Sequence, residues 1–484
     1  MSVEPRNLIR IGTLKSRSAK DISHSRLGIG FEKLDRAVFD PEKAYPKLAS
    51  LGLKWVRLQS GWQRTERKKG VYDFAWIDRV VNRLLGLGMI PWVCLCYGND
   101  LYNEEAKSVF GAVGVPPIFT EEQRAAWRNY CFAFAEHFRG RVRHYEVWNE
   151  PDNRPCWKHG TNATELGHFT IETAKAVRAA DPDAYLIGGV FTYRIGFLNE
   201  AMQTGMGDFL NAISYHAYHC EEADLLGKAR GVRGVCDLYS PDLEIIQGES
   251  GAQSRNDGSG ALRLGNWTPA RQAKFLLRHL TTDLSANIKF TSYFSCVDMV
   301  EALNGTVGDK ASYLDYGYFG VLGADFDENG VSTGDYTPKP SYYALQNLAA
   351  LFADGGAPCA LPVVIRQEPQ AQSWLTADLR AAELMQAGFL LAGGAKAFAY
   401  WKPADLLSET YEGTVSLNAA FPPKTPLHLL DPMDGAVYKM GESAAVFDAF
   451  GNYAIRHIPV RDYPLFLIFG DLPAVEPFVE KQEI

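Results

Sequence analysis

The amino-acid sequence predicts a (β/α)8 barrel followed by a β-sandwich. Short apolar runs alternate with helical patterns from residue 26 to residue 353, which is typical of parallel strands joined by helices. Eight such runs occur, and eight is the number of strands that closes a barrel of this kind. Beyond residue 358 the pattern changes to shorter alternating runs separated by turn residues, which favours a sandwich.

The eight expected strands are short and rich in β-branched and aromatic residues. They cover residues 27–31, 54–58, 89–96, 144–150, 184–187, 209–215, 243–249 and 288–294. Between them, apolar residues recur at helical spacing. Helices are expected at 41–51, 76–87, 121–139, 166–180, 269–285 and 341–352. Neither Gly-x-Gly-x-x-Gly nor Gly-x-x-x-x-Gly-Lys occurs, so a doubly wound nucleotide-binding sheet is disfavoured and no cofactor is expected.

The two ends of the chain are assigned to the sandwich. Its expected strands are 398–401, 413–417, 427–430, 436–438, 453–457 and 465–468, and residues 381–391 fit a helix or a strand pair equally well. The N-terminal segment, 1–21, is polar and basic with one apolar stretch at 8–11, which we expect to add an edge strand to this later domain. The expected units are therefore 1–21, a barrel at 22–353 and a sandwich at 354–484, packed directly on one another because no long linker is visible.

Composition narrows the class of partner. Apolar residues make up 46% and charged residues 22%, as in globular proteins, and the net charge of -8 offers no basic stripe for nucleic acid or an anionic membrane. No run is long enough to span a membrane, and the N-terminus lacks the apolar core of a signal peptide. Eight scattered cysteines without a Cys-x-x-Cys pair favour free thiols in a reducing cytoplasm, although a chain whose leader had been removed would look the same. We expect a neutral small-molecule partner, with the oligomeric state, including a homo-oligomer, left open.

Two of the expected strands end on a glutamate. The fourth ends in Trp148-Asn149-Glu150-Pro151, and the seventh ends in Gly248-Glu249. A carboxyl group in the low dielectric at a strand end has its pKa raised toward neutrality, which makes it a usable general acid. By itself a glutamate before proline is more often a solvated turn residue, and Glu249 could merely pair with an arginine. In one barrel, however, both side chains reach the same face, where paired carboxylates are the minimal apparatus for cleaving a glycosidic bond.

With both glutamates placed, the chain resembles the clan of (β/α)8 retaining glycoside hydrolases whose acid/base and nucleophile lie at the ends of strands four and seven. Within it the chain is most similar to family 39, the β-xylosidase and α-L-iduronidase family. Besides the two glutamate motifs, the resemblance includes residues 70–78, 216–218 and 338–342 and the trailing sandwich. It implies that Glu150 is the acid/base, protonated at rest, and that Glu249 is the nucleophile. A retaining pair should lie about 5 to 5.5 Å apart, and an inverting pair about 6.5 to 9.5 Å.

Further site residues are indicated by the local sequence and by the resemblance. Arg57 stands inside an apolar run and is costly to bury unless paired; the resemblance implies that it keeps Glu249 ionised, and a purely structural ion pair is the alternative. The resemblance also implies that Asn149 binds the sugar 2-hydroxyl and that His216 and Tyr218, which alternate on one strand face, lie beside the nucleophile. His216 and His219 could bind a metal, but no third ligand stands at workable spacing, so no metal is expected.

The remaining candidates lie in or beside loops at the strand ends. Flat aromatic rings there can stack on sugars, although most large aromatics are core residues, so about two of five should touch ligand. These five are Trp62, Trp92, Trp148, Trp157 and Trp267. Asp298 and Glu301 follow strand eight and could hold sugar hydroxyls, although loop carboxylates are more often only solvated.

The predicted function is hydrolysis of β-glycosidic bonds in short oligosaccharides or glycosides, in the manner of a β-xylosidase, by double displacement. Exo action is preferred because a cytoplasmic enzyme meets imported fragments. An endo-glycanase or transglycosylase using the same site would need an open groove. A carbohydrate-binding barrel without catalysis is the alternative from another class, and it is disfavoured because both carboxylates are present.

Overall fold

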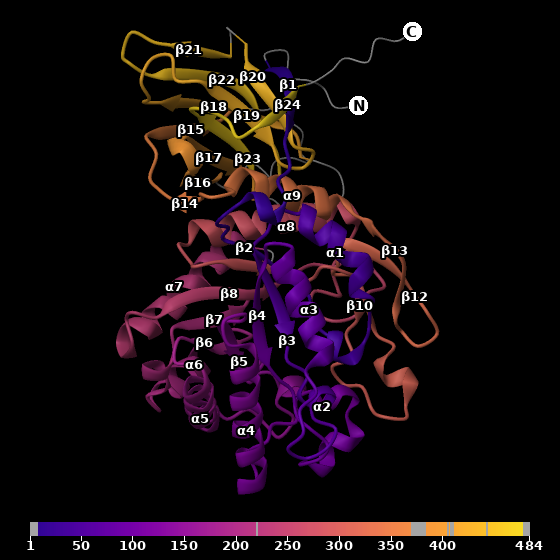
Figure 1. Cartoon of the computed structure of the whole chain (residues 1–484). Coiled ribbons are helices and arrows are strands. Elements are labelled where there is room, and N and C mark those ends of the chain that lie inside the picture. The colour runs from indigo at the N-terminus through magenta and orange to yellow at the C-terminus, as the bar shows by residue number, and fades with distance from the viewer. Residues whose placement is uncertain are drawn as a thin grey trace.

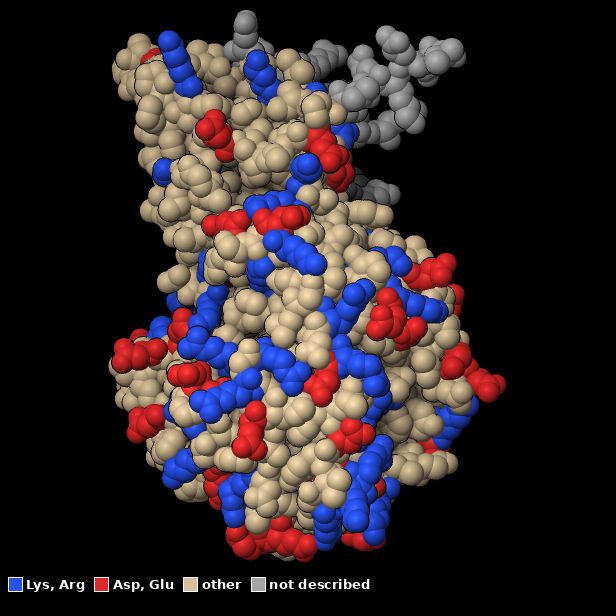
Figure 2. All heavy atoms as spheres, in the orientation of Figure 1, with Lys and Arg blue, Asp and Glu red and all other residues tan. Residues whose placement is uncertain are grey.

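The computed structural model describes residues 8–218, 221–368, 384–403, 406, 411–441 and 444–477. Two units stack along one axis, with helices surrounding the larger unit and antiparallel sheets forming the smaller one (Figure 1). Within the described ranges, no helix has the length and apolar character to cross a membrane. On the face shown in Figure 2, the larger unit carries many charged side chains of both signs and the smaller one carries few.

Eight parallel strands close the barrel in sequence order, which confirms the predicted fold class. Nearly every residue in them is buried, because the strands face packed side chains inside the barrel and helices outside it. The strands are β2 (Leu27–Gly30), β3 (Trp55–Gln59), β4 (Ile90–Leu95), β5 (His144–Val147), β6 (Tyr185–Phe191), β7 (Ala212–His216), β8 (Glu244–Ser250) and β9 (Thr291–Tyr293).

Helices cover the outside of the barrel. Several begin at the caps that the sequence contains: the Thr120 side chain accepts from Gln123 N, and Thr268 accepts from Arg271 N just before Pro269. The helices are α1 (Pro41–Ser50), α2 (Trp62–Thr65), α3 (Ala75–Gly86), α4 (Glu121–Phe138), α5 (Ala163–Ala180), α6 (Ile195–Met202), α7 (Glu222–Tyr239), α8 (Pro269–Ser285) and α9 (Pro340–Phe352). Neither α6 nor α7 was predicted; α7 contains three glycines, which weaken the helical pattern although packing against the barrel sustains the helix.

An unpredicted excursion separates β9 from α9. It contains two strand pairs, β10 (Met299–Val300) with β11 (Tyr316–Gly317), and β12 (Leu322–Phe326) with β13 (Ser332–Pro338). Its first half joins the loop that follows β4: Phe110 N donates to Gly305 O at 2.9 Å, and the Phe110 ring stacks on Tyr313. Because both segments leave the carboxyl ends of strands, they meet at the end of the barrel where the two glutamates lie.

The smaller unit consists of antiparallel sheets, as predicted. One sheet has the order β14-β16-β17-β23-β19-β20-β1-β24 and the other β15-β18-β22-β21. Their strands are β1 (Leu8–Leu14), β14 (Ala357–Pro358), β15 (Val363–Gln367), β16 (Met385–Leu390), β17 (Lys396–Trp401), β18 (Gly413–Ala419), β19 (Leu427–Asp431), β20 (Ala436–Met440), β21 (Ala445–Phe447), β22 (Tyr453–Val460), β23 (Leu465–Phe469) and β24 (Val475–Pro477). Of residues 381–391, for which a helix and a strand pair were both predicted, Met385–Leu390 form the strand β16. Residues 381–383 lie outside the described ranges.

The N-terminal strand joins this sheet but does not form its edge. β1 pairs with β20 on one side and with β24 on the other. The prediction of an edge strand is therefore corrected: the short β24 takes that position, because residues 475–477 pair with the other side of β1.

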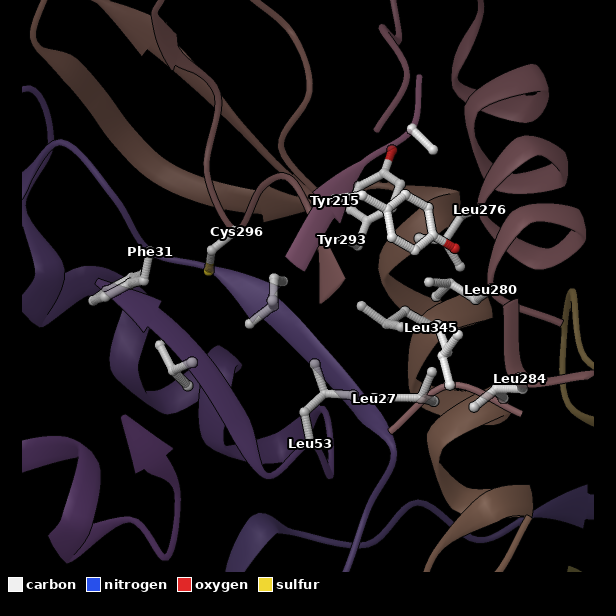
Figure 3. Packing of buried hydrophobic residues seen from close by; sticks show 14 of the residues in the cluster. Leu27, Phe31, Leu53, Tyr215, Leu276, Leu280, Leu284, Tyr293, Cys296 and Leu345 are labelled. Atoms are coloured by element: carbon white, nitrogen blue, oxygen red, sulfur yellow. The ribbon is translucent and has the colours of Figure 1, made fainter. Parts of the chain in front are cut away.

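α8 packs tightly between the barrel and the sheets. Leu276, Leu280 and Leu284, one helical turn apart, point toward Leu27 and Tyr293 of the barrel (Figure 3). On the side of the sheets, Lys274 forms a buried ion pair with Asp462 at 2.7 Å, with 2% and 0% of the side chains exposed. The predicted direct packing of the two units thus includes a buried ion pair.

Candidate active site

Glu150 stands where β5 opens into a loop, in a backbone conformation that L-residues rarely adopt. Its φ is +47°, and that of Trp148 is +66°. Hydrogen bonds to both neighbouring strands hold this turn: Trp148 N donates to Leu95 O at 3.1 Å, and Glu150 N donates to Val190 O at 2.8 Å. Strain of this kind persists only where the surroundings fix it, and here it fixes the direction of the Glu150 side chain.

Glu249 lies near the end of β8 and is held by two partners. Its Oε2 accepts from Arg57 Nη1 at 2.6 Å, and its Oε1 accepts from the Tyr218 hydroxyl at 2.6 Å. The preceding residue must be small, because a Cβ on Gly248 would lie 2.3 Å from Ser214 Oγ. The Gly-Glu pair therefore lets the strand pass close to β7 before the carboxylate turns into the site.

The two glutamates meet at the carboxyl end of the barrel. One carboxylate oxygen of each, together with one ring nitrogen of His216, lie within 4.8 Å of one another. This gap fits the short spacing of a retaining pair, about 5 to 5.5 Å, and is too short for the water that an inverting pair must admit.

Arg57 connects the site to the barrel interior. Its guanidinium is fully buried and donates to Glu146 Oε2 at 2.7 Å, to Glu249 Oε2 and to Asn149 Oδ1 at 2.9 Å. Burial lowers the pKa of Arg57, but these carboxylates raise it well above its usual value, so the charge is kept. The structure thus places Arg57 in contact with both Asn149 and Glu249.

His216 and Glu150 form a coupled pair. His216 Nδ1 is hydrogen-bonded to Glu150 Oε1 at 2.9 Å and lies 3.7 Å from Glu249 Oε2. Burial raises the pKa of the Glu150 carboxyl, but the hydrogen bond and the charge of His216 outweigh it, and the pKa is lowered. Burial lowers the pKa of His216, but Glu249 and Glu150 raise it above its usual value.

Both pKa shifts favour an ionised Glu150 beside a protonated His216 in the free site, which differs from the expectation that Glu150 is protonated at rest. The sequence could indicate that the carboxyl is buried, but it could not show that an imidazole approaches Glu150 directly.

Three residues of the site were not predicted. Asn153 Nδ2 donates to Glu150 Oε2 at 2.8 Å, and Cys156 Sγ lies 3.7 Å from the same oxygen. The Tyr97 hydroxyl accepts from Asn149 Nδ2 at 2.9 Å. Asn153 and Cys156 follow Glu150 closely in sequence, but only the turn after Pro151 folds them back, and nothing in the sequence distinguishes Tyr97 from other aromatics after a strand.

Four of the candidate tryptophans are corrected, because none of them faces a space that a sugar could enter. Trp92 is fully buried among Trp55, Phe290 and other side chains at the amino ends of the strands, far from the glutamates. Trp148 and Trp157 are fully buried and pack on each other edge to face. Trp267 is 4% exposed and donates its indole N–H to Leu262 O at 2.6 Å. Trp62, the fifth, is equally buried under Tyr102 and Tyr130 but lines a cavity at the carboxyl ends of the first barrel strands.

Asp298 and Glu301, the two candidate carboxylates after strand eight, differ in their surroundings. Asp298 is 3% exposed and pairs with Lys339 at 2.7 Å while accepting from Gly320 N, so its assignment to the substrate is corrected to a structural contact. Glu301 lies 3.4 Å from Lys33 Nζ, and burial, together with the nearby charge of Glu249 among others, raises its pKa. Glu301 thus lies near enough to Glu249 for the two charges to interact, and it remains a candidate for binding sugar hydroxyls.

Within the described ranges, Glu150, His216 and Glu249 are also the group of three side chains that could hold a metal ion. Direct hydrogen bonding of His216 to Glu150 accounts for their closeness. His219, the other histidine considered for a metal site, lies outside the described residues.

The barrel and the paired carboxylates at the ends of its fourth and seventh strands define the class of retaining (β/α)8 glycoside hydrolases. The family model described as Glycosyl hydrolases family 39 matches residues 48–224, which include Arg57, Glu150 and His216. Over these residues the chain is thus similar to family 39, as the resemblance stated above implied.

Curated relatives are distant. A β-xylosidase of Geobacillus stearothermophilus is 28% identical over 165 residues, 31% of each chain, and an endo-1,4-β-xylanase A of Phanerodontia chrysosporium is 30% identical over 129 residues, 26% of this chain and 29% of that one. The match therefore spans less than a third of these relatives. A family 39 glycoside hydrolase from Bacteroides cellulosilyticus WH2 shares the fold with a TM-score of 0.62 at 18% identity, over 92% of this chain and 80% of that one.

Proposed function

We propose that the protein is a retaining glycosidase that cleaves β-glycosidic bonds, above all β-xylosidic ones, in short oligosaccharides or glycosides. The observation that carries the proposal is the approach of Glu150 and Glu249 to within 4.8 Å at the carboxyl end of the barrel. The choice of β-xylosides is supported by the relatives, which are named β-xylosidase and endo-1,4-β-xylanase.

In the first step Glu249 attacks the anomeric carbon and forms a glycosyl ester. The carboxylate is available because Arg57 and Tyr218 hold both of its oxygens in place. The glycosidic C–O bond breaks, and Glu150 gives the leaving oxygen a proton that it takes from His216 Nδ1 at 2.9 Å. Glu150 and His216 together thus supply the proton for the leaving group, since the pKa of Glu150 is lowered in the free site.

In the second step the same residues act in reverse. Glu150, now a carboxylate beside a neutral His216, takes a proton from a water molecule, whose oxygen attacks the anomeric carbon. The ester bond to Glu249 breaks, and its carboxylate returns to Arg57 and Tyr218. Two inversions at the same carbon give net retention of configuration.

Asn149 and Glu301 are proposed to bind the sugar. Asn149 is oriented by Arg57 and Tyr97, so its amide is fixed before substrate arrives. A hydrogen bond from it to the 2-hydroxyl would strengthen as positive charge develops on the ring. Glu301, held by Lys33, offers a second acceptor for hydroxyls.

Exo action is supported by the closure of this end of the barrel. The loop after β4 and the excursion after β9 are joined by backbone hydrogen bonds from Phe110 to Gly305 and from Val307 to Ser108, each of 2.9 Å. Only 11% of the Glu150 side chain and 14% of the Glu249 side chain remain exposed. An endo-acting enzyme or a transglycosylase for long chains would need an open groove past these carboxylates.

A panel of aryl glycosides tests the proposal. We expect the wild type to hydrolyse aryl β-D-xyloside faster than the corresponding glucoside, galactoside or α-L-arabinoside. Glu150→Ala should lower kcat/KM on an unactivated xyloside by about 10²- to 10⁴-fold, the usual contribution of a general acid. Azide should restore part of its turnover on an aryl xyloside and yield a β-xylosyl azide, because the small anion attacks the ester in the vacated space.

Glu136→Ala, an exposed change on α4, is the matched control and should behave as wild type. A wild type that binds xylo-oligosaccharides but hydrolyses no aryl glycoside would instead favour the binding protein without catalysis.

A further inference from the structure

A cavity opens at the carboxyl ends of the first three barrel strands, the same end of the barrel as the catalytic residues. Its volume is about 380 Å³, enough for one sugar unit. Its walls come from the loops after β2, β3 and β4 and from the excursion after β9. They include Asp35, Arg36, Gln63, Arg64, Arg67 and Tyr97.

Tyr97 connects this cavity to the reaction site. Its ring lines the cavity and has the Arg36 guanidinium carbon 5.8 Å from its centroid, and its hydroxyl contacts Asn149 at 2.9 Å. Asn149 in turn precedes Glu150 and bonds Arg57. One aromatic side chain therefore separates the cavity from the residues that surround the reacting sugar.

The walls carry more positive than negative charge, although the whole chain carries -8. Arg36, Arg64 and Arg67 line the cavity, against the single carboxylate of Asp35. Asp35 is already paired with Arg36 Nε at 3.4 Å. Arg67 is exposed and makes no ion pair with any residue that the structure describes. The excess charge favours an anionic occupant.

Two buried polar atoms of the walls have no partner within the described part of the chain. Arg36 is 3% exposed and is fixed by Asp35 and by Gln59 Oε1, yet its Nη1 makes no hydrogen bond. Gln63 Oε1 is likewise unpaired. A buried guanidinium nitrogen without an acceptor is costly, and a ligand that supplies a carboxylate and a hydroxyl would satisfy both atoms after a small movement of the side chains.

We infer that this cavity is a second sugar-binding subsite, next to the reacting sugar, which takes a sugar unit that carries a carboxylate, such as a uronic acid group on an oligosaccharide. The inference rests on the proposed function, because it adds a substrate class to the same site. Guanidinium groups recognise carboxylates through paired N–H donors, which distinguishes this subsite from one for neutral sugars.

Binding to a variant without turnover tests the subsite separately from catalysis. The probes are a xylotriose that carries one glucuronic acid group and the same oligosaccharide after reduction of its carboxyl group to a primary alcohol. On a Glu249→Gln background at low salt, calorimetry should show at least tenfold tighter binding of the acidic probe. This preference should fall as salt rises, because an exposed arginine contributes to it.

Substitutions in the walls should reduce the ratio of the two affinities. We expect Arg67→Gln to reduce it about threefold and Arg36→Lys, which keeps a charge but loses the fork of donors, about tenfold. Arg230→Gln is the matched control: this arginine is also exposed and also lines a cavity, one at the amino ends of the strands, and its loss should leave the ratio unchanged.

Equal binding of the two probes, or a preference that survives both Arg67→Gln and Arg36→Lys, would overturn the inference. Should Arg36→Lys fail to fold, Arg67→Gln decides, because the exposed Arg67 side chain has no described contact to lose. Failure of the proposed function would appear separately, as a lack of aryl glycoside hydrolysis by the wild type.

Discussion

At the active centre the titrations of Glu150 and His216 are coupled through a hydrogen bond of 2.9 Å. Burial lowers the pKa of His216, but the carboxylate of Glu249, 3.7 Å from Nδ1, together with Glu150, raises it. The charge of Arg57 opposes this effect. The pH dependence of the site is therefore a property of the group and not of one carboxyl.

Glu249→Gln should lower the pKa of His216, because the variant removes the largest of the influences that raise it. The measurement is an NMR titration of labelled histidine, with Glu136→Gln as the control that leaves the value in place. In the wild type the alkaline limb of kcat/KM should lie above pH 6.5 or so, the ordinary value for histidine, since the pair loses its proton there. A His216 pKa that stays the same or rises in Glu249→Gln would contradict this account.

Single residues were predictable where their chemistry conflicts with their surroundings. Arg57 was predictable as a site residue because a charge inside an apolar run must be paired, and it is paired with Glu146 and Glu249. Tryptophan gives no such signal, since it is equally suited to a core. Trp92 lies in the first half of its strand and therefore packs at the amino end of the barrel.

Among the secondary-structure elements, the segment before β2 is joined to the end of α9 by the side chain of Asp354. It accepts hydrogen bonds from Ser23 N at 2.7 Å and His24 N at 2.9 Å and pairs with Arg17 at 3.1 Å. Burial raises its pKa, but these bonds outweigh burial and lower the pKa to about 2. Its contribution to stability is therefore complete above the unfolded pKa, near 4, and is lost as the pH falls toward 2.

Asp354→Ala should lower the free energy of unfolding at pH 7 by about 1 to 2 kcal/mol, a modest value because a quarter of the side chain is exposed. The variant should also lose less stability than the wild type between pH 4 and pH 2. Urea unfolding at several pH values measures both effects. Asp208→Ala, at an exposed aspartate, should reproduce the wild-type curve; parallel losses in wild type and Asp354→Ala below pH 4 would argue against the role of Asp354.

Elements with strong periodicity or clear caps were predictable, and those that depend on neighbours were not. α4 and α8 begin at threonine caps and present apolar faces. The excursion containing β10 to β13 consists of very short or polar strands, whose pairing depends on contacts distant in sequence.

For the whole molecule, the sheets and the barrel share buried charges. Lys274 of α8 meets Asp462, which precedes β23, and Trp401 Nε1 of β17 donates to Glu222 of α7 at 2.7 Å. Such contacts link the stability of one unit to that of the other.

Asp462→Ala should therefore destabilise the protein by roughly 3 kcal/mol, because it leaves the buried Lys274 without this carboxylate. Calorimetry should show one unfolding transition, shifted to lower temperature, with Asp471→Ala at an exposed site of the same unit unchanged. A loss below about 0.5 kcal/mol, or a separate early transition of the sheets alone, would show that the units are not coupled through this pair.

The sequence by itself determined the barrel, the trailing sheets and the two glutamates, because strand and helix periodicity is local and a carboxylate at a strand end is visible in the chain. Only the tertiary structure decided which groups surround Glu150 and Glu249, that His216 contacts Glu150, and that three arginines line an adjacent cavity. Those features arise between loops far apart in sequence, and pKa values and cavities depend on distances that no local pattern encodes.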